Sequence, residues 1–549
     1  MQDHKLRKPD CGGNAWGRKQ QKGKQVDLQD LMDALSDPRA YLHPVVGLHM
    51  LQTHASCVFL TGEYAYKIKK PVNFGFLDYG TLERRRRCCE RELQLNRRLC
   101  PEVYLDLVPI GWLGGRLCIR APGPPVEWAV RMRQLPEEDM LPVRLASGKV
   151  APADIERIAN VLVDFHGRAL ANSDITQFGA PEAIWRNMEE NFHQTEPRIG
   201  EALPREHLDE IREYSREFID RERDLLLTRM RKGRVRDGHG DLRAQNLCLY
   251  AGLQAGLQVL DCIEFNDRFR YEDVAADLAY LAMDLDLVGR ADLRQVLIDQ
   301  YVERSADPDL RRLLSFYCCY RAYVRGKIAL LAAEEAEVPA AERQSQHELA
   351  ATAFDLSRSY ATRRNRPVLL LMSGYSGSGK SALAHELSRR LPAVRLTSDG
   401  ARKELEGVAP AVRLPGDRYT SERRSAVYAE LRRRATAYLA RGENVILDAT
   451  FLDPEERERA ATLAEEWQTE SRVIACHCPD AVIRMRLTQR ATTSGESDAD
   501  VAVYEAQLHS HAGRFKQELE RTRVHWIAAD TDQPARLTAR TVMQEFWGG

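Results

Sequence analysis

The clearest chemical signature in this 549-residue chain is a glycine-rich loop that ends in lysine and serine. The run Gly374 to Ser381 reads GYSGSGKS and follows the apolar stretch Val368 to Met372. Glycines let backbone N–H groups converge on phosphates, the lysine reaches the β and γ oxygens, and the serine ligates Mg²⁺. The sequence therefore predicts a nucleotide site made by Gly374, Ser376, Gly377, Ser378, Gly379, Lys380 and Ser381. A flexible Gly/Ser loop is the competing interpretation.

Carboxylates and arginines beyond this loop could complete a phosphoryl-transfer site. Asp448 ends an apolar run and is suited to hold Mg²⁺ through water. Asp399 follows a predicted strand, where it could be the base for an acceptor hydroxyl, and Arg402 comes one helical turn later. Arg486 and Arg490 share a face of a predicted helix and could close over the transferring phosphate. A solvated helix face explains that arginine pair equally well.

A second set of polar residues lies well upstream. Residues 239–246 read HGDLRAQN, and Asp261 follows an apolar pair. In such a loop Asp241 would place a carboxylate at a substrate hydroxyl, while Asn246 and Asp261 would offer oxygens to Mg²⁺. A turn stabilised by Asp and Asn side chains is the alternative interpretation.

A lysine and a helix nearer the N-terminus fit the same chemistry. Lys67 lies on the predicted strand Ala65 to Ile68, as the phosphate-pairing lysine of a kinase should. A helix predicted from Thr81 to Leu99 carries Glu90 and Glu92, and either carboxylate could orient the lysine. The order lysine, base, metal ligands supports a site rather than an isolated turn.

Composition indicates a globular protein of several domains. The chain is too long for a single core, and its 80 basic and 81 acidic residues give a net charge of -1. That balance disfavours nucleic acid as a partner. No apolar run approaches the roughly 20 residues that span a bilayer, and the N-terminus lacks the apolar core of a secretory signal. The 12 cysteines are scattered rather than spaced as a disulfide framework, which is typical of a reducing compartment. We therefore expect a cytoplasmic protein without a membrane partner.

The elements that must position these residues fall into five segments. Residues 1–25 are basic and polar and are expected to be a disordered tail. Residues 26–135 are strand-rich with one helix, and 136–356 are mainly helical. Residues 357–367 are polar and basic, which makes them the best linker candidate. Residues 368–549 alternate strands and helices, which favours a parallel α/β sheet.

The upstream region that contains Lys67, Asp241 and Asp261 resembles the aminoglycoside phosphotransferase family, a branch of the protein-kinase-like fold, over residues 40–350. We call this the first site, because it comes first along the chain. The resemblance rests on GHGDL at 238–242 and DCIEF at 261–265. It implies an α+β bilobal domain, with a strand-rich lobe at 26–135 and a helical lobe at 136–356. It also implies these roles: Asp241 as catalytic base, Asn246 and Asp261 as Mg²⁺ ligands, Lys67 on the nucleotide phosphates, and Glu92 as the better partner of Lys67.

Two departures from that family stand out. Arg243 occupies a position where many relatives have a second histidine, and the chain has no G-x-G-x-x-G loop to cover the phosphates. The family includes kinases for choline, sugars and other small alcohols, so the resemblance does not imply antibiotic modification.

The last segment resembles the small P-loop kinases related to polynucleotide kinase and zeta-toxin-like enzymes, over residues 367–530. Beside the glycine-rich loop, the matching pieces are SDGAR at 398–402, LDAT at 447–450 and RLTQR at 486–490. The resemblance implies an α/β P-loop NTPase domain with a parallel sheet. It further implies that Asp399 activates an acceptor hydroxyl and that Arg402 helps to bind the acceptor.

Together these observations predict an ATP- and Mg²⁺-dependent phosphotransferase with two nucleotide sites that acts on hydroxyl groups of small molecules. One alternative is a nucleotide-binding regulator that lacks transferase activity in one or both domains. Another is a kinase for RNA or protein. The sequence leaves open the acceptors, the choice between ATP and GTP, and the oligomeric state.

Overall fold

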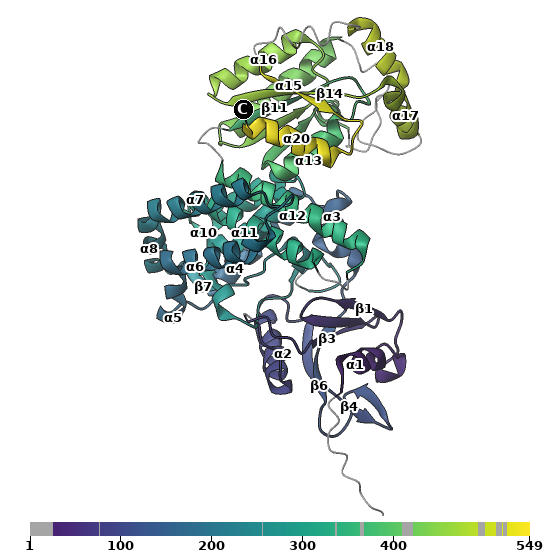
Figure 1. Ribbon diagram of the computed structural model, residues 1–549, viewed down its shortest axis with the longest axis vertical. Helices are drawn as coiled ribbons and strands as arrows, with labels where there is room; N and C mark the ends of the chain where they lie inside the picture. Colours follow the sequence, from purple (N-terminus) through teal and green to yellow (C-terminus); the bar gives the residue numbers. More distant parts are fainter. Residues whose placement is uncertain are drawn as a thin grey trace, which may run out of the picture. The chain divides into compact units, whose positions relative to one another are not determined.

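The computed structural model describes residues 26–75, 77–254, 256–334, 338–362, 367–408, 421–491, 500–511, 519 and 524–548. The chain divides into two compact units (Figure 1). The first comprises residues up to 97 and 101–134, and the second comprises 98–100 and everything from 135 onward. The expected tail at 1–25 lies outside the described residues.

The first unit is built on a six-stranded antiparallel sheet of order β1-β2-β3-β6-β4-β5. Its strands are β1 (His49–Gln52), β2 (Ser56–Leu60), β3 (Tyr64–Lys69), β4 (Tyr104–Leu113), β5 (Arg116–Ile119) and β6 (Glu127–Arg133). Helix α1 (Leu28–Leu35) packs its apolar face into the same core as Phe59, Tyr66 and Ile110. Strands β2 and β3 form an antiparallel hairpin in which Leu60 lies opposite Ala65, so the strand expected at Ala65 to Ile68 is confirmed.

Helix α2 (Leu82–Asn96) is the long helix of this unit. The side chain of Thr81 caps it by accepting a hydrogen bond from the backbone N–H of Arg84 at 3.2 Å. The helix ends at Asn96, before the expected Leu99, and it packs against β4 and β6. This packing turns Glu92 inward, where its side chain is fully buried.

The second unit begins with a mainly helical region, as expected. Its helices are α3 (Leu141–Ala146), α4 (Pro152–Arg168), α5 (Ser173–Thr176), α6 (Pro181–Thr195), α7 (Arg205–Arg221), α8 (Arg223–Arg231), α9 (Val274–Leu287), α10 (Ala291–Ser305), α11 (Leu310–Ala333) and α12 (Ala340–Ala361). Short strands interrupt them at β7 (Val235–Asp237), β8 (Leu247–Cys248), β9 (Gln258–Val259) and β10 (Tyr271–Asp273). Every residue of α9 is buried, so this helix is the centre of the core. Within the described residues, no helix combines the length and apolar character that a membrane crossing requires.

The linker expected at 357–367 starts later in the structure, because α12 continues to Ala361. Ser357, Ser359 and Tyr360 are each at most 3% exposed. Ser359 donates its hydroxyl proton to the carbonyl oxygen of Arg390 at 2.5 Å. The polar character of this stretch therefore serves buried hydrogen bonds rather than solvent contact. Residues 363–366 lie outside the described residues.

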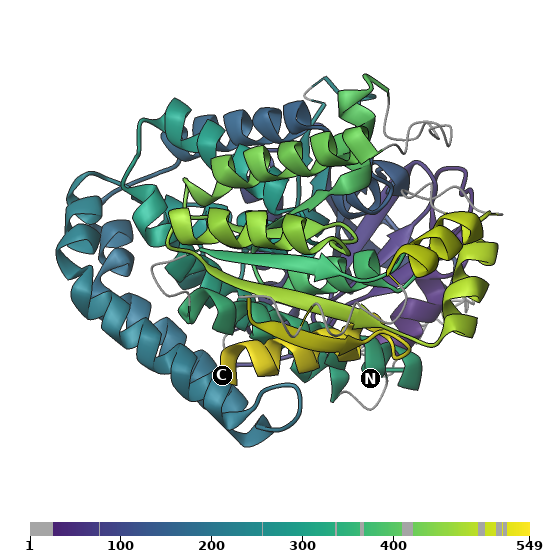
Figure 2. The same cartoon turned by 90° about the horizontal axis from the view of Figure 1, so that it is seen from above.

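The C-terminal half holds a five-stranded sheet of order β12-β13-β11-β14-β15, in which every neighbouring pair is parallel. The strands are β11 (Val368–Ser373), β12 (Ala393–Thr397), β13 (Asn444–Asp448), β14 (Glu470–His477) and β15 (Trp526–Asp530). The helices are α13 (Lys380–Arg390), α14 (Ser398–Leu405), α15 (Ser421–Leu439), α16 (Pro454–Glu466), α17 (Asp480–Ala491), α18 (Val501–His511) and α20 (Ala535–Gly548). Figure 2 shows this sheet between two layers of helices. One core contains α13 and α20, and the other contains α15 and α16.

The helical region and the parallel sheet pack together within the second unit. Arg294 of α10 is only 5% exposed and contacts Asp286 at 3.0 Å and Glu443 at 2.5 Å. Arg389 of α13 donates from Nε to the carbonyl oxygen of Leu287 at 3.0 Å. The two halves therefore share a buried, charged contact rather than only a connecting segment.

Candidate functional sites

The glycine-rich loop between β11 and α13 has the backbone that its sequence predicts. Gly374, Gly377 and Gly379 all have positive φ, at 145°, 81° and 85°. A Cβ atom on Gly374 would lie 2.6 Å from the carbonyl oxygen of Cys476, and one on Gly377 would lie 2.9 Å from Leu487. These close approaches leave no room for a side chain, so the glycines let neighbouring strands and helices close around the loop.

The polar side chains of the loop are buried at its base. Lys380 opens α13, is 8% exposed, and donates from Nζ to the carbonyl oxygen of Tyr375 at 2.6 Å. Ser378 is 1% exposed, and its hydroxyl has no hydrogen-bond partner among the described residues. Ser381, in contrast, is exposed. The loop thus concentrates hydrogen-bond donors at the carboxyl end of β11.

Parallel pairing brings Asp448 beside this loop. Asp448 ends β13 and lies in register with Met372 of β11 and Thr397 of β12. Burial raises the pKa of this carboxyl above its usual range, although the charges of Arg395 and Lys380 and a hydrogen bond from Ser381 act in the opposite direction. The pairing of adjacent parallel strands therefore explains why residues so far apart in sequence meet.

The donors at this point fit a magnesium ion. Ser381 and Asp448 offer a hydroxyl and a carboxylate, the oxygen ligands that Mg²⁺ prefers. Oδ2 of Asp448 is buried and has no hydrogen-bond partner among the described residues. In the described part of the chain no cluster of three His, Cys, Asp or Glu residues forms a metal cage. Two protein oxygens are nevertheless enough where phosphates and water complete the coordination.

A cavity of about 1200 Å³ opens over the loop and contains the expected acceptor-side residues. Asp399 in the first turn of α14 and Arg402 in its last turn contact each other, with Nη1 of Arg402 2.5 Å from Oδ1 of Asp399. The cavity wall includes the following groups: Lys380, Ser381, Asp399, Arg402, Asp448, Arg486, Gln507 and Thr531. The volume is slightly above the roughly 300–1,000 Å³ that is typical of sites for small ligands.

The two arginines of α17 have different outcomes. Arg486 lines the cavity and donates from Nη2 to the carbonyl oxygen of Thr531 at 2.7 Å. Its direction toward the loop favours a role at the phosphates over a solvated helix face. Arg490 lies on the same helix, but its side chain is outside the described residues.

Three residues at this site were missed from the sequence. Arg395 of β12 lies 3.7 Å from Oδ2 of Asp448. Thr531 donates from Oγ1 to the carbonyl oxygen of Ser378 at 2.5 Å, and Gln507 hydrogen-bonds Ser376. The apolar run before Thr531 could have indicated β15. Nothing in the local sequence distinguishes Gln507.

In the first unit, Lys67 and Glu92 form a buried ion pair. Nζ of Lys67 lies 2.8 Å from Oε1 of Glu92, whose Oε2 lies 2.5 Å from Nζ of Lys69. The alternative partner Glu90 instead faces outward and pairs with Arg86 at 3.1 Å. Thus α2 holds a carboxylate against the lysine of β3, the arrangement that a phosphate-pairing lysine requires.

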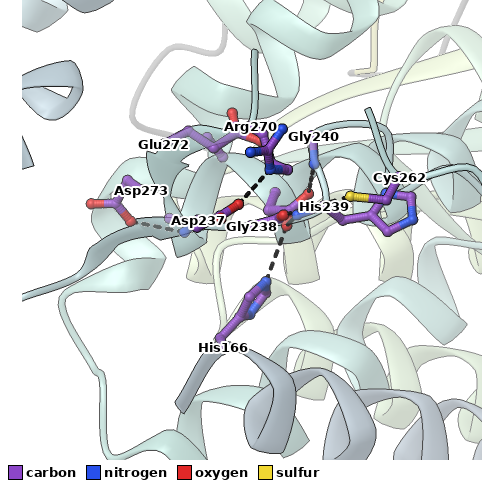
Figure 3. Close-up of polar contacts among 12 residues, drawn as sticks. His166, Asp237, Gly238, His239, Gly240, Cys262, Arg270, Glu272 and Asp273 are labelled. Carbon is purple, nitrogen blue, oxygen red and sulfur yellow. Dashed lines mark hydrogen bonds and ion pairs between the residues drawn. The ribbon is translucent and has the colours of Figure 1, made fainter. Parts of the chain in front are cut away.

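In the second unit, a tight loop after β7 carries Asp241. Two carboxylates of α9 hold the backbone of this loop. Asp277 accepts hydrogen bonds from the N–H groups of His239 and Gly240 at 2.6 and 3.0 Å, and Asp284 accepts from that of Ala244 at 2.9 Å. Figure 3 shows this loop with His239 and Gly240 at its centre. The buried helix therefore determines where Asp241 lies.

His166 supports this loop indirectly, through its contact with Asp277. Its Nε2 lies 3.2 Å from Oδ2 of Asp277. Burial raises the pKa of Asp277, but the hydrogen bond from His166 and the neighbouring donors outweigh burial and hold that pKa below its usual range. Arg270 contacts Asp237 beside the loop. Asp277 therefore remains an anion that can accept the backbone hydrogen bonds.

The two expected magnesium ligands of this region lie close to each other. Asn246 donates from Nδ2 to the backbone and side-chain oxygens of Asp241 at 2.9 and 3.0 Å, which leaves its Oδ1 available to a metal. The backbone oxygen of Asn246 accepts from the N–H of Leu260 at 2.8 Å. Asp261 follows with a φ of 61°, unusual for a residue other than glycine. The amide oxygen of Asn246 and the carboxylate of Asp261 are of the ligand type that Mg²⁺ prefers.

Arg243 is the unexpected member of this cluster. Its Nε lies 2.7 Å from Oδ1 of Asp241, and its Nη2 lies 2.7 Å from Oδ2. Burial lowers the pKa of Arg243, but the charge of Asp241 outweighs this effect and the guanidinium remains protonated. The residue that replaces the second histidine of many relatives therefore holds both carboxylate oxygens of the expected base.

These features define the C-terminal half as a P-loop nucleotide-binding domain that follows a protein-kinase-like α+β part. In agreement, the family model for the AAA domain matches residues 369–513. Along most of its length the chain is similar to protein Rv2004c of Mycobacterium tuberculosis, with 32% identity over 469 residues, 84% of this chain and 90% of that protein. The chain belongs to the family of this mycobacterial protein.

Solved structures are similar to each half at low identity. A choline/ethanolamine kinase family protein from Mesorhizobium loti is 14% identical and covers 60% of this chain and 99% of its own, with a TM-score of 0.37. A gluconokinase from Sinorhizobium meliloti is 19% identical and covers 34% and 98%, with a TM-score of 0.24. At these scores neither structure decides the fold or the activity of this chain.

Proposed function

We propose that this chain is an ATP- and Mg²⁺-dependent phosphotransferase with two nucleotide sites, acting on hydroxyl groups of small molecules. The observation that carries the proposal is the cavity over the glycine-rich loop. It collects a phosphate-binding lysine, a pair of magnesium-compatible oxygens and a carboxylate with an adjacent arginine. Each of these groups has a role in phosphoryl transfer.

At the P-loop site the backbone amides and Lys380 would hold the phosphates of ATP. Asp399 would accept the proton of the acceptor hydroxyl. The hydroxyl oxygen would attack the γ-phosphorus, and ADP would leave in line. Arg402 holds Asp399 in place, and Arg486 is directed toward the same space. A magnesium ion on Ser381 and Asp448 would neutralise phosphate charge.

At the kinase-like site Asp241 would be the base, and Asn246 and Asp261 would hold magnesium. Lys67, oriented by Glu92, would contact the nucleotide phosphates. Two observations support these roles: Asp277 of α9 holds the backbone of the Asp241 loop, and Lys67 forms a buried ion pair with Glu92.

One observation favours a second candidate function for this first site. Because Arg243 contacts both oxygens of Asp241, the carboxylate is engaged before any acceptor arrives. A site in this state suits a nucleotide-binding regulator that does not transfer phosphate. The two candidates differ in whether a phosphorylated product depends on Asp241.

The test incubates the full-length protein with Mg²⁺, γ-labelled ATP and a cell extract separated into small-molecule, RNA and protein fractions. Lys380→Ala and Asp241→Asn are compared with Lys232→Ala, an exposed lysine paired with Asp309. We expect label in the small-molecule fraction, lost in part with each site variant and kept in the control. Label that persists unchanged in both site variants contradicts the proposal. Binding of ATP without a product sensitive to Asp241→Asn supports the regulator at the first site.

A further inference from the structure

Thr531, the residue directly after β15, connects the glycine-rich loop to another part of the sheet. Its backbone N–H donates to the carbonyl oxygen of His477, the last residue of β14, at 2.9 Å. Its hydroxyl lies 2.5 Å from the carbonyl oxygen of Ser378 and 2.9 Å from that of His477. A hydroxyl has only one proton to donate. Because the carbonyl of His477 already accepts from the backbone N–H, the hydroxyl proton goes to Ser378, the nearer acceptor.

This hydrogen bond determines the direction of a neighbouring backbone donor. The peptide bond between Ser378 and Gly379 is trans, as are all peptide bonds of the described residues. In a trans peptide the C=O and the N–H point in opposite directions within one rigid plane. A hydroxyl that holds the carbonyl of Ser378 therefore also fixes the direction in which the N–H of Gly379 points.

The N–H of Gly379 is placed to serve as a phosphate donor. Gly379 is the N-cap residue of α13 and lines the cavity together with Lys380 and Ser381. Within the described part of the chain, this N–H donates to no protein acceptor. Backbone N–H groups where a glycine-rich loop enters its helix are the donors that hold nucleotide phosphates. The peptide that Thr531 holds therefore carries one of these donors.

Thr531 also packs directly against Gly379. A Cβ atom on Gly379 would lie 3.0 Å from Cβ of Thr531 and 3.1 Å from Nη1 of Arg486. The backbone oxygen of Thr531 accepts a hydrogen bond from Nη2 of Arg486 at 2.7 Å. Thr531 thus holds the loop peptide through its hydroxyl and Arg486 through its backbone. Only the first of these two hydrogen bonds depends on the side chain, so a substitution can separate them.

We propose that Thr531 is a positioning residue for phosphate binding. Its hydroxyl holds the peptide between Ser378 and Gly379 in the orientation that presents the N–H of Gly379 to a phosphate oxygen. Without the hydroxyl this N–H loses its fixed direction, while α13 and α20 keep their packing in a shared apolar core. The inference rests on the proposed function in one respect, which is that the loop binds nucleotide phosphates.

The test measures the affinity of the full-length protein for pyrophosphate and for Mg²⁺-ADP by calorimetry. Lys380→Ala identifies the part of the binding that belongs to this loop. Thr531→Ala removes the hydroxyl but keeps the backbone oxygen that holds Arg486, and Thr531→Ser restores a hydroxyl. Thr538→Ala is the matched control, because Thr538 is also buried and its hydroxyl donates to a backbone carbonyl outside the loop, that of Asp530, at 2.7 Å.

We expect Thr531→Ala to weaken the loop's binding of both ligands by the same factor, about 10-fold, the worth of one hydrogen bond to a charged group. Thr531→Ser and Thr538→Ala should stay close to the wild type. The inference is overturned, and the proposed function stands, if pyrophosphate binds Thr531→Ala as tightly as the wild type. Equal weakening in Thr531→Ser or Thr538→Ala has the same meaning. A folded wild-type protein that binds neither ligand, or binds both regardless of Lys380→Ala, overturns the inference and the proposed function of this loop.

Discussion

Replacing Arg294 with alanine should strongly destabilise the second unit. Arg294 is 5% exposed and is bonded to Asp286, which is fully buried, and to Glu443, whose side chain is 10% exposed. Removal of the guanidinium takes away a positive charge that two buried carboxylates share. Breaking a buried ion pair from one side costs about 3–5 kcal/mol, since the remaining charge keeps its desolvation penalty.

Arg304→Ala is the matched control, because it removes an arginine from the same helix. Arg304 pairs with Asp164 at 2.8 Å, but both side chains are roughly half exposed. Such surface pairs contribute about 0–1 kcal/mol. The assay is urea unfolding followed by circular dichroism, on the full chain.

A double variant tests the role of these charges. Adding Glu443→Gln to Arg294→Ala removes one of the two buried carboxylates that have lost Arg294, so the double variant should recover part of the lost free energy of unfolding. If Arg294→Ala and Arg304→Ala unfold within about 0.5 kcal/mol of each other, the contact between the halves does not carry the energy assigned to it.

Two further predictions concern buried ionisable groups. Glu92→Gln should lower the free energy of unfolding of the first unit by about 3 kcal/mol, because Lys67 and Lys69 lose the buried carboxylate that they share. Glu90→Gln, at an exposed ion pair on the same helix, should change this free energy little. Equal urea midpoints for the two variants would contradict the prediction. Burial, and then the charge of Arg358, lowers the pKa of His207 to about 4. Between about pH 6.5 and 4, this histidine is therefore protonated in the unfolded chain but neutral in the folded protein. The free energy of unfolding consequently falls as the pH falls through this window. His207→Gln should lose about 2 kcal/mol less than the wild type between pH 7 and pH 5, and an identical loss in urea unfolding would refute the assignment.

Much of the fold was predictable because local patterns and the fold agree. The apolar runs before Gly374 and at Asp448 correctly predicted β11 and β13, since buried parallel strands are almost continuously apolar. The end of α12 was not predictable in this way. Ser357 and Ser359 read as solvent-exposed linker, yet they are buried because their hydroxyls find backbone carbonyls at Cys319 and Arg390. A tertiary partner that lies far away in sequence leaves no local signal.

The candidate sites divide along the same line. Residues that act through the backbone geometry of a short motif, such as Gly374 and Lys380, can be recognised from their spacing. Residues that reach a site from another element, such as Gln507 and Arg395, could not be recognised, because only the packing of α18 and the register of β12 bring them there. The choice between Glu90 and Glu92 illustrates an intermediate case. Both lie on α2, and the rotation of that helix against the sheet decides which one meets Lys67.

The arrangement of α9 and α13 explains why the two halves of the second unit should be studied in one chain. Helix α9 holds the Asp241 loop through Asp277 and Asp284, and its last residue, Leu287, accepts a hydrogen bond from Arg389 at the end of α13. The first residue of α13 is Lys380. A cut at residues 357–367 would therefore separate Leu287 from Arg389, and it would expose the charged contact between Arg294 and Glu443. Loss of activity in either fragment would then report the broken contact rather than the chemistry of the site.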